Sequence, residues 1–388
     1  MTTGRTTADA STAGRDGGLE RTRSVIEQGI ADGTHIGAQL SVAHDGHEYD
    51  IAIGEARPGV AMTTDSMMIW FSMSKATCAV AIAQQWERGA LRIDEPAATY
   101  VPDFARNGKE AVTIRHLLTH TAGFPWACGI VTGKPWRESV ADNRARIYAA
   151  PLEPGWQPGR RAAYHPTSAH TVLGAIVEAL DGRPYDRYVR DEIFEPLGMS
   201  DSWIGMPAER FDAYGERIGE MQNTADGTSL GLLGIDTREV APLPIPGANG
   251  RGPMHELRRL YEMLLGEGAL GGVRLLSPQT VAALGARHRV GMIDETFGID
   301  INWGLGLAID SYIMGRHCSP RTFGHGGAQS SAAYCDPEHG VAAAVVCNGM
   351  PGGERHAARM DAIASAIYED LGLVEGEGRF KPYPTTGL

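Results

Sequence analysis

The chain has 388 residues, of which 43% are hydrophobic and 21% are charged, and its formal net charge is -12 at pH 7. These values are typical of a soluble globular protein with enough apolar side chains for a large core and for two domains. The negative charge disfavours nucleic acid and anionic membranes as partners, because both bind clustered lysine and arginine.

The N-terminal residues 1–18 are rich in Thr, Ala and Gly and contain no apolar h-region. They therefore predict a disordered leader and not a secretory signal. The scattered spacing of the five cysteines gives neither a disulfide framework nor a metal-binding CxxC motif. No apolar run approaches the roughly 18 residues that span a bilayer. Together these features predict a reduced, cytoplasmic protein that does not bind membranes.

The two ends of the chain predict a single antiparallel sheet. Residues 19–33 have helical spacing, and residues 38–56 alternate in period two around an Asp-Gly turn, which is a strong hairpin signal. Residues 330–349 again form two apolar strands about a turn, and residues 355–373 form an amphipathic helix. The economical arrangement is one sheet flanked by the two terminal helices.

The middle of the chain predicts helices separated by Gly and Pro loops, as in residues 113–120, 168–180 and 186–199. We therefore expect an α/β fold whose antiparallel sheet, flanked by terminal helices, carries an inserted, mainly helical domain. The clearest linker is the Pro- and Gly-rich segment 242–252. The predicted division is a leader (1–18), a discontinuous sheet domain (19–76 and 236–375), a helical domain (77–235) and a C-terminal tail (376–388).

Ser72 and Lys75 lie three residues apart in the segment IWFSMSKATCAVAIA, residues 69–83. If a helix begins at about Ser72, the two side chains share one face and the Lys75 amine reaches the Ser72 hydroxyl. The helix N-terminus adds positive potential where an oxyanion would develop. A buried neutral lysine can accept the serine proton, which gives an activated nucleophile without a histidine.

The flanking residues distinguish this interpretation from an ordinary helix cap with a surface lysine. Ser-x-x-Lys alone is a weak pattern that occurs by chance in most chains. Trp70, Phe71 and the alanine-rich segment after the motif indicate a buried helix, where an unpaired lysine would be costly. Unlike arginine, a desolvated lysine can lose its proton. Lysine is also rare in this chain, where it occurs only as Lys75, Lys109, Lys134 and Lys381.

Ser-x-x-Lys is a signature of β-lactamases and penicillin-binding proteins, and further motifs of that group follow it in the right order. Over roughly residues 20 to 372 the chain resembles the serine β-lactamase-like superfamily. The similar branch contains class C β-lactamases, family VIII carboxylesterases and related D-aminopeptidases and acyltransferases. The motifs are TIRHLLTHTAGF (113–124), GRRAAYHPTSAH (159–170), EPLGMSDSW (195–203) and FGHGGAQSSAAY (323–334).

The resemblance implies a catalytic role for several residues. Ser72 is the nucleophile, and Lys75 together with Tyr164 moves the serine proton to the leaving group. A Tyr164 phenolate beside the lysine ammonium is a plausible base. The oxyanion hole consists of the backbone N–H groups of Ser72 and Ala328. The resemblance implies no cofactor and no metal.

The third motif, His325-Gly326-Gly327, is predicted to bind substrate. The two glycines leave the strand edge open to it. His325 replaces the lysine that helps β-lactamases to bind a carboxylate, and it offers only a pH-dependent charge. Pro166 stands where β-lactamases carry the asparagine of Tyr-x-Asn, which removes an amide that would contact a substrate amide. Both departures point away from β-lactam substrates.

Other candidate residues carry weaker signals. His165 adjoins the motif tyrosine and is a candidate for lining the site. Trp126 and Trp136 lie in a Gly- and Pro-rich loop that overhangs the pocket in this family, although packing of the helical domain explains them equally well. His116 and His120 have a metal-ligand spacing but lack the adjacent Glu of HExxH, so we expect no metal site there.

These observations predict acyl-enzyme chemistry on a small-molecule acyl substrate. The leading function is carboxylesterase-like cleavage of a small or medium ester. The alternative is transfer of an acyl group from an ester or thioester to an amine or alcohol acceptor in small-molecule biosynthesis, through the same acyl-enzyme. A third hypothesis, a non-catalytic binding descendant of the fold, is disfavoured because Ser72, Lys75 and Tyr164 are all retained. Nothing in the sequence specifies an oligomeric state.

Overall fold

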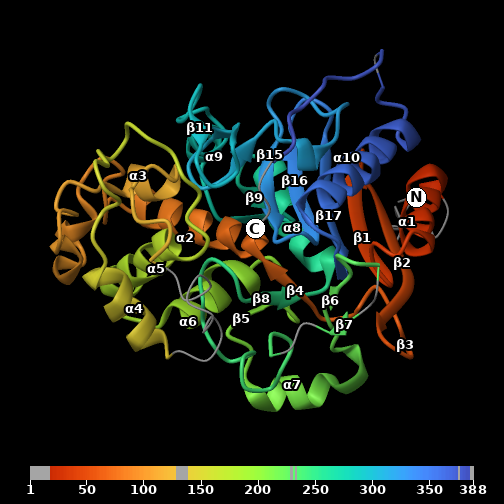
Figure 1. Ribbon diagram of the computed structural model, residues 1–388, viewed down its shortest axis with the longest axis horizontal. Coiled ribbons are helices and arrows are strands. Elements are labelled where there is room, and N and C mark those ends of the chain that lie inside the picture. Colours follow the sequence, from red (N-terminus) through yellow and green to blue (C-terminus); the bar gives the residue numbers. More distant parts are fainter. Residues whose placement is uncertain (1–17, 128–138, 228–229, 232–233, 375, 385–388) are drawn as a thin grey trace, which may run out of the picture.

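The computed structural model describes residues 18–127, 139–227, 230–231, 234–374 and 376–384. The predicted leader up to residue 17 lies outside them. Within the described residues, an eight-stranded antiparallel sheet forms the centre of one part of the molecule (Figure 1). Its strands, in spatial order, are β13 (Asn302–Trp303), β14 (Ala308–Ile309), β15 (Phe323–Gly327), β16 (Ser331–Asp336), β17 (Val341–Cys347), β1 (Gly37–His44), β2 (His47–Arg57) and β3 (Val60–Ala61).

Helices cover both faces of this sheet. The terminal helices α1 (Glu20–Ala31) and α10 (Gly353–Asp370) pack side by side on one face, and α8 (Met254–Leu265) lies against β1, β16 and β17 on the other (Figure 1). This arrangement confirms the predicted α/β fold with an antiparallel sheet flanked by terminal helices. The sheet is buried on both sides because helices stand on both sides.

Alternation along β1 shows how the sequence builds the two faces. Leu40 and Val42 point into the core under α1 and α10. Gln39 and Ser41 are equally buried but point the other way, toward α8. There the Nε of Arg258 donates a hydrogen bond to Ser41 Oγ at 2.7 Å. Period-two alternation therefore separates an apolar face from a face where buried polar groups fix α8.

The hairpin between β1 and β2 forms at the predicted turn. His44 pairs with His47, so the loop contains only Asp45 and Gly46. Both have positive φ, 48° and 74°, as a two-residue hairpin turn of this hand requires.

A second part of the molecule is built mainly from helices (Figure 1). Its central helix, α2 (Lys75–Glu87), is buried along almost its whole length and packs against α5 (Ser168–Asp181) and against β15 of the large sheet. The other described α-helices are α3 (Ile114–Leu118), α4 (Val140–Ala149), α6 (Tyr185–Val189), α7 (Ala208–Tyr214) and α9 (Pro278–Leu284). The division of the chain into two domains at the predicted boundaries stays a prediction.

Short strands connect these parts. One small sheet, in the order β4-β8-β5, lies at the start of α2 and therefore positions the candidate nucleophile. The remaining small sheets have the orders β18-β6-β7, β10-β9 and β11-β12. The strands are β4 (Met68–Phe71), β5 (Trp203–Ile204), β6 (Gln222–Asn223), β7 (Leu230–Gly231), β8 (Gly250–Gly252), β9 (Ala269–Leu270), β10 (Val273–Arg274), β11 (Ile293–Asp294), β12 (Ile299–Asp300) and β18 (Gly349–Met350).

Two side chains attach the start of α2 to β8. The indole Nε1 of Trp70, which is fully buried, donates to Gly252 O at 3.0 Å. The hydroxyl of Ser74 donates to Phe71 O at 2.6 Å and accepts from Gly250 N at 2.8 Å. These bonds leave no room for a side chain at position 250, because an added Cβ would lie 2.6 Å from both Ser74 Oγ and the Trp70 ring.

We expect Gly250→Ala to lower the free energy of unfolding by about 3 kcal/mol, because the new methyl group overpacks a buried contact. Gly46→Ala is the control: its Cβ enters open space, so only the positive φ is penalised, by about 1 kcal/mol. Urea denaturation of both variants measures the difference. Equal losses would show that the contact at Gly250 yields without cost.

Candidate active site

Ser72 lies at a sharp turn between a strand and a helix. Strand β4 ends at Phe71, residues Ser72–Ser74 form a single 3-10 turn, and α2 begins at Lys75. Phe71 has φ 47° and ψ -129°, a conformation that is strained for a residue with a Cβ. Met73 and Ser74 are buried, whereas Ser72 is partly exposed. The turn thus presents the Ser72 hydroxyl at the surface while the residues around it are fixed.

The amine of Lys75 contacts three oxygen atoms. Its Nζ lies 2.8 Å from Ser72 Oγ, 2.7 Å from Pro166 O and 2.7 Å from Gly247 O, and the side chain is fully buried. An ammonium group can donate to all three oxygens. A neutral amine can donate to the two carbonyls and accept the hydroxyl proton of Ser72 with its lone pair. The geometry therefore suits both protonation states that proton transfer requires.

One loop binds both the backbone N–H and the backbone carbonyl of Tyr164. Tyr164 N donates to Asp294 Oδ1 at 2.9 Å, and Thr296 Oγ1 donates to Tyr164 O at 3.1 Å. Asp294 is buried and forms an ion pair of 3.0 Å with Arg289, so its charge is compensated. The Tyr164 ring lies 5.0 Å from Lys75 Nζ, and its phenol is hydrogen-bonded to Ser72. The structure thus brings Ser72, Lys75 and Tyr164 together.

Burial raises the pKa of the Tyr164 phenol well above its usual range, and the hydrogen bond with Ser72 offsets this only in part. Asp294 raises that pKa further by charge repulsion. This direction argues against the phenolate expected from sequence. A neutral phenol can still relay protons, because its hydroxyl both donates and accepts.

Strand β15, which carries the His325-Gly326-Gly327 motif, ends beside the nucleophile turn. A Cβ on Gly327 would lie 2.5 Å from Trp70 O and 3.3 Å from Phe71 Cβ, so only glycine allows this approach. Ala328 follows directly, and the pairing of its backbone N–H with that of Ser72 as an oxyanion hole stays a prediction. The strand turns back at Gln329, which has φ 44°.

His325 is almost completely buried, and its Nδ1 donates to Gly326 O at 2.6 Å. Burial, followed by the nearby charge of Lys75, lowers the pKa of His325 to about 3. The side chain is therefore neutral at physiological pH. It cannot supply the positive charge with which a lysine at this place would attract a carboxylate.

Further histidines surround the tyrosine. The ring centroid of His120 lies 4.6 Å from that of Tyr164, 5.8 Å from that of His165 and 5.7 Å from that of His170. Trp303 closes the group on the side of His120, at 4.5 Å. Burial lowers the pKa of all three histidines, that of His165 to about 3. The environment of the candidate nucleophile is thus aromatic and, apart from Lys75 and the Arg289 ion pair, largely uncharged.

The remaining predicted site residues differ in accessibility. His165 is fully buried: its Nδ1 donates to Ala163 O at 2.7 Å and its Nε2 accepts from Phe124 N at 3.2 Å. Both ring nitrogens thus support the loops around Tyr164, and a direct contact with substrate stays a prediction. Trp126 is 40% exposed. Trp136 lies outside the described residues.

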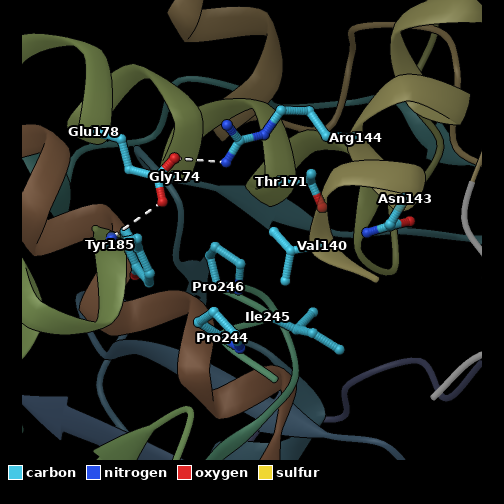
Figure 2. A pocket seen from close by; sticks show the side chains of 10 residues that line it. All are labelled: Val140, Asn143, Arg144, Thr171, Gly174, Glu178, Tyr185, Pro244, Ile245 and Pro246. Atoms are coloured by element: carbon cyan, nitrogen blue, oxygen red, sulfur yellow. Dashed lines mark hydrogen bonds and ion pairs between the residues drawn. The ribbon is translucent and has the colours of Figure 1, made fainter. Parts of the chain in front are cut away.

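The loop that contacts Lys75 through Gly247 O also borders a cavity. Pro244, Ile245 and Pro246 line one side of this cavity, and residues of α4 and α5 line the other (Figure 2). Figure 2 shows the ion pair between Arg144 and Glu178, at 2.6 Å, across its upper edge.

Sequence reasoning missed several of these contributions. Segment 242–252 was expected to be a linker, yet it supplies Gly247 O to Lys75 and strand β8 to the nucleophile turn. Carbonyl oxygens have no sequence signature. Trp303 comes from a segment with no known motif, whereas His120 and His170 stand in two of the predicted motifs but were not assigned to the site. Among the described residues, no cluster of His, Cys, Asp and Glu has a metal-binding arrangement.

The fold and the site define a class of protein: a serine hydrolase or acyltransferase in which a serine at a strand-to-helix turn is paired with a lysine one turn later. No helix of the described residues is both long and apolar enough to cross a membrane.

A family model described as Beta-lactamase matches residues 22–367, so the chain belongs to the Beta-lactamase family. Penicillin-binding protein 4 of Amycolatopsis lactamdurans is 31% identical over 334 residues, which are 81% of each chain. Esterase/beta-lactamase LipL of Mycobacterium tuberculosis is 28% identical over 344 residues, 80% of this chain and 77% of that protein. A solved structure of a penicillin-binding protein homolog from Caulobacter crescentus matches with 29% identity and a TM-score of 0.75, and covers 91% of this chain and 97% of that one.

The buried histidines predict acid sensitivity of the fold. In the unfolded chain a histidine has a pKa of about 6.5, so below this pH the unfolded state binds protons that folded His165 and His325, with pKa values of about 3, do not. The free energy of unfolding should therefore fall between about pH 6.5 and pH 4, by about 1 kcal/mol per pH unit for each such histidine.

Urea denaturation across this pH range measures the slope. His165→Gln should make it shallower, whatever its effect on stability at pH 7. His47→Gln, which removes a histidine from the exposed hairpin turn, is the matched control. A slope that does not change in His165→Gln would contradict the assignment.

Proposed function

We propose that the protein is a carboxylesterase-like hydrolase that forms an acyl-enzyme at Ser72 and cleaves a neutral ester of small or medium size. The observation that carries this proposal is the 2.8 Å contact between Lys75 Nζ and Ser72 Oγ, with the amine fixed by two backbone carbonyls. A base fixed in this way needs little reorganisation when the hydroxyl attacks.

In the acylation step, the neutral Lys75 amine takes the Ser72 proton as Oγ forms a bond to the ester carbonyl carbon. The negative charge that develops on the carbonyl oxygen is stabilised by the N–H groups of Ser72 and Ala328. The bond to the alcohol oxygen then breaks. The proton taken by Lys75 passes to that oxygen through the neutral phenol of Tyr164.

In the deacylation step, water takes the place of the alcohol and the same groups act in reverse. Water gives its proton through Tyr164 to Lys75 and attacks the acyl carbon, and the acid is released as Ser72 recovers its proton. The carboxylate of Asp294 is engaged by Arg289 and by the backbone of Tyr164. Lys75 and Tyr164 are therefore the groups proposed to activate the second nucleophile.

The charges near the serine support esters over β-lactams as substrates. His325 is neutral and Pro166 offers only its carbonyl, which Lys75 already uses. A substrate carboxylate would therefore lose its hydration without gaining a cationic partner at position 325. Neutral esters require no such compensation.

Replacing the proposed groups tests the mechanism. Ser72→Ala should lower kcat/KM for a chromogenic short-chain ester by about 10³ or more. Lys75→Ala, Tyr164→Phe and the double variant should lose comparable activity, because residues that act as one unit are not additive. The parent protein should hydrolyse a chromogenic cephalosporin slowly or not at all.

Ser74→Ala is the matched control for Ser72→Ala. Its hydroxyl bonds to Phe71 O and Gly250 N, so its loss should lower stability by about 1–3 kcal/mol and still allow a fluorophosphonate probe to label Ser72. Ester hydrolysis by Ser72→Ala above about a tenth of the parent value would contradict the proposal, since loss of a nucleophile costs far more.

Acyl transfer is the second candidate, because Lys75 and Tyr164 can deprotonate an alcohol or amine as readily as water. The exposed ring of Trp126, two residues after Phe124, whose backbone N–H contacts His165, offers apolar surface to an organic acceptor. Water is present at about 55 M, so transfer requires a bound acceptor with an effective molarity well above that value.

A competition experiment between water and acceptors distinguishes hydrolysis of the acyl-enzyme from acyl transfer. An ester donor is held constant, a panel of amines and alcohols is added at millimolar concentration, and the products are identified by mass spectrometry. We expect the free acid to dominate with every acceptor. A saturable rise of one amide or new ester would reverse this ranking and identify an acyltransferase, whereas Ser72→Ala should yield neither product.

A further inference from the structure

The C-terminal segment after α10 folds back onto the large-sheet region. Arg379 N donates to Arg316 O at 2.9 Å, and the Tyr383 hydroxyl donates to Asp361 at 3.0 Å. The Tyr383 ring also packs edge-on against Tyr312, with 5.8 Å between centroids. Within this predicted tail, Lys381 is buried, and Arg379 and Tyr383 also contact the rest of the structure, whereas Phe380 is exposed.

Lys381 and Cys318 meet within this packed segment. The Nζ of Lys381 lies 2.7 Å from Cys318 Sγ and 2.9 Å from Asp310 Oδ1. Cys318 is 2% exposed and Lys381 is 8% exposed. The separation of nitrogen and sulfur is shorter than the roughly 2.9 Å of an ordinary N–H···O bond, although sulfur is the larger atom. The two atoms are therefore closer than a simple hydrogen bond to sulfur explains.

One oxygen atom bonded to both nitrogen and sulfur, at an ordinary tetrahedral angle, spans this separation. The surroundings also suit its formation. Burial raises the pKa of the Cys318 thiol, and the charge of the adjacent Lys381 offsets this in part, toward the thiolate that oxidants attack. The Arg379 guanidinium lies 3.8 Å from Cys318 Sγ. Asp310 can accept the proton that the lysine must lose before its nitrogen reacts.

We propose that Cys318 and Lys381 form a reversible covalent bridge, Sγ–O–Nζ, when the protein meets dioxygen or a peroxide. The thiol, the amine and one dioxygen molecule give the bridge and one water; with hydrogen peroxide, two peroxide molecules are consumed and three waters form. The S–H bond and one N–H bond break, and one S–O bond and one N–O bond form. Sulfur and nitrogen each lose two electrons, and dioxygen gains the four. A dithiol reductant, acting twice, restores the thiol and the amine and releases the bridging oxygen as water.

The bridge fixes the C-terminal segment near the candidate active site. Cys318 lies between the turn at Tyr312–Met314 and strand β15, and Tyr312 is close enough to Tyr164 to affect the pKa of that phenol. Oxidation would thus tie the chain end covalently to a wall of the site. The cysteines Cys335 and Cys347, which are buried within the sheet, have no lysine in contact among the described residues.

Peptide mapping of the full chain tests the bridge. Cleavage by trypsin after Arg316, Arg321 and Arg379 releases residues 317–321 and 380–388. Protein exposed to air or dilute peroxide should yield these peptides joined, with a mass equal to their sum plus one oxygen and minus two hydrogens. Reduction with dithiothreitol should separate them. Reoxidation under ¹⁸O₂ should place the heavy isotope in the bridge.

Cys318→Ser and Lys381→Met should each abolish the joined peptide, and Cys335→Ala should retain it. The isotope and reductant experiments use the unaltered chain, so the proposal stays testable if a variant fails to fold. It is overturned if no joined peptide forms after oxidation. It is equally overturned if Cys318 instead yields sulfinic acid, or if the joined peptide lacks the added oxygen or resists dithiothreitol.

Discussion

The site depends on a lysine amine that is buried where an isolated charge would be unstable. Lys75 Nζ meets oxygens from three segments far apart in the chain, at Ser72, Pro166 and Gly247. Removing an ammonium from water costs several kcal/mol unless its hydrogens find partners, so these carbonyls are a condition of the fold as well as of the chemistry. The loops that carry Tyr164 and Gly247 are thereby fixed relative to α2. The proposed catalytic groups and the packing of the two parts of the molecule share one set of contacts.

The nucleophile turn adds a second constraint. Phe71 adopts a strained conformation, and such strain persists only when surrounding contacts over-determine it. Ser74, Trp70 and strand β8 provide those contacts. Because Ser74 already bonds to Phe71 O and Gly250 N, its hydroxyl is engaged, whereas that of Ser72 is directed to Lys75. The two serines of the SMSK segment therefore differ: Ser74 holds the turn, and Ser72 is the proposed nucleophile.

The contributions that sequence could predict are local ones. The hairpin at Asp45 and Gly46 follows from period-two alternation about a turn dipeptide, and the contact of Ser72 with Lys75 follows from their spacing on one helix. The helix-flanked antiparallel sheet also follows from such patterns.

The acceptors of Lys75 could not be predicted in this way, since any residue has a backbone carbonyl and only tertiary folding decides which one reaches the amine. The Pro- and Gly-rich composition of segment 242–252 indicated a loop correctly but could not show that the loop enters the site. The ionisation of Tyr164 was misjudged for the same reason, because burial depends on elements distant in sequence.

The histidines around the site are neutral mainly because they are buried, and the nearby Lys75 amine adds to this effect at His325 and His170. Burial lowers the pKa of His325 and His170 most, and the charge of Lys75 lowers both further, so a proton on the lysine disfavours protons on these imidazoles. In the proposed mechanism one proton moves among Ser72, Lys75 and Tyr164, and the neutral histidines beside them do not bind that proton. The same neutrality removes positive charge from the place where a substrate carboxylate would bind. In the proposed mechanism the preference for neutral esters and the transfer of the serine proton are therefore linked. A lysine in place of His325 would attract anionic substrates, and its charge would also shift the proton equilibrium between Ser72 and Lys75.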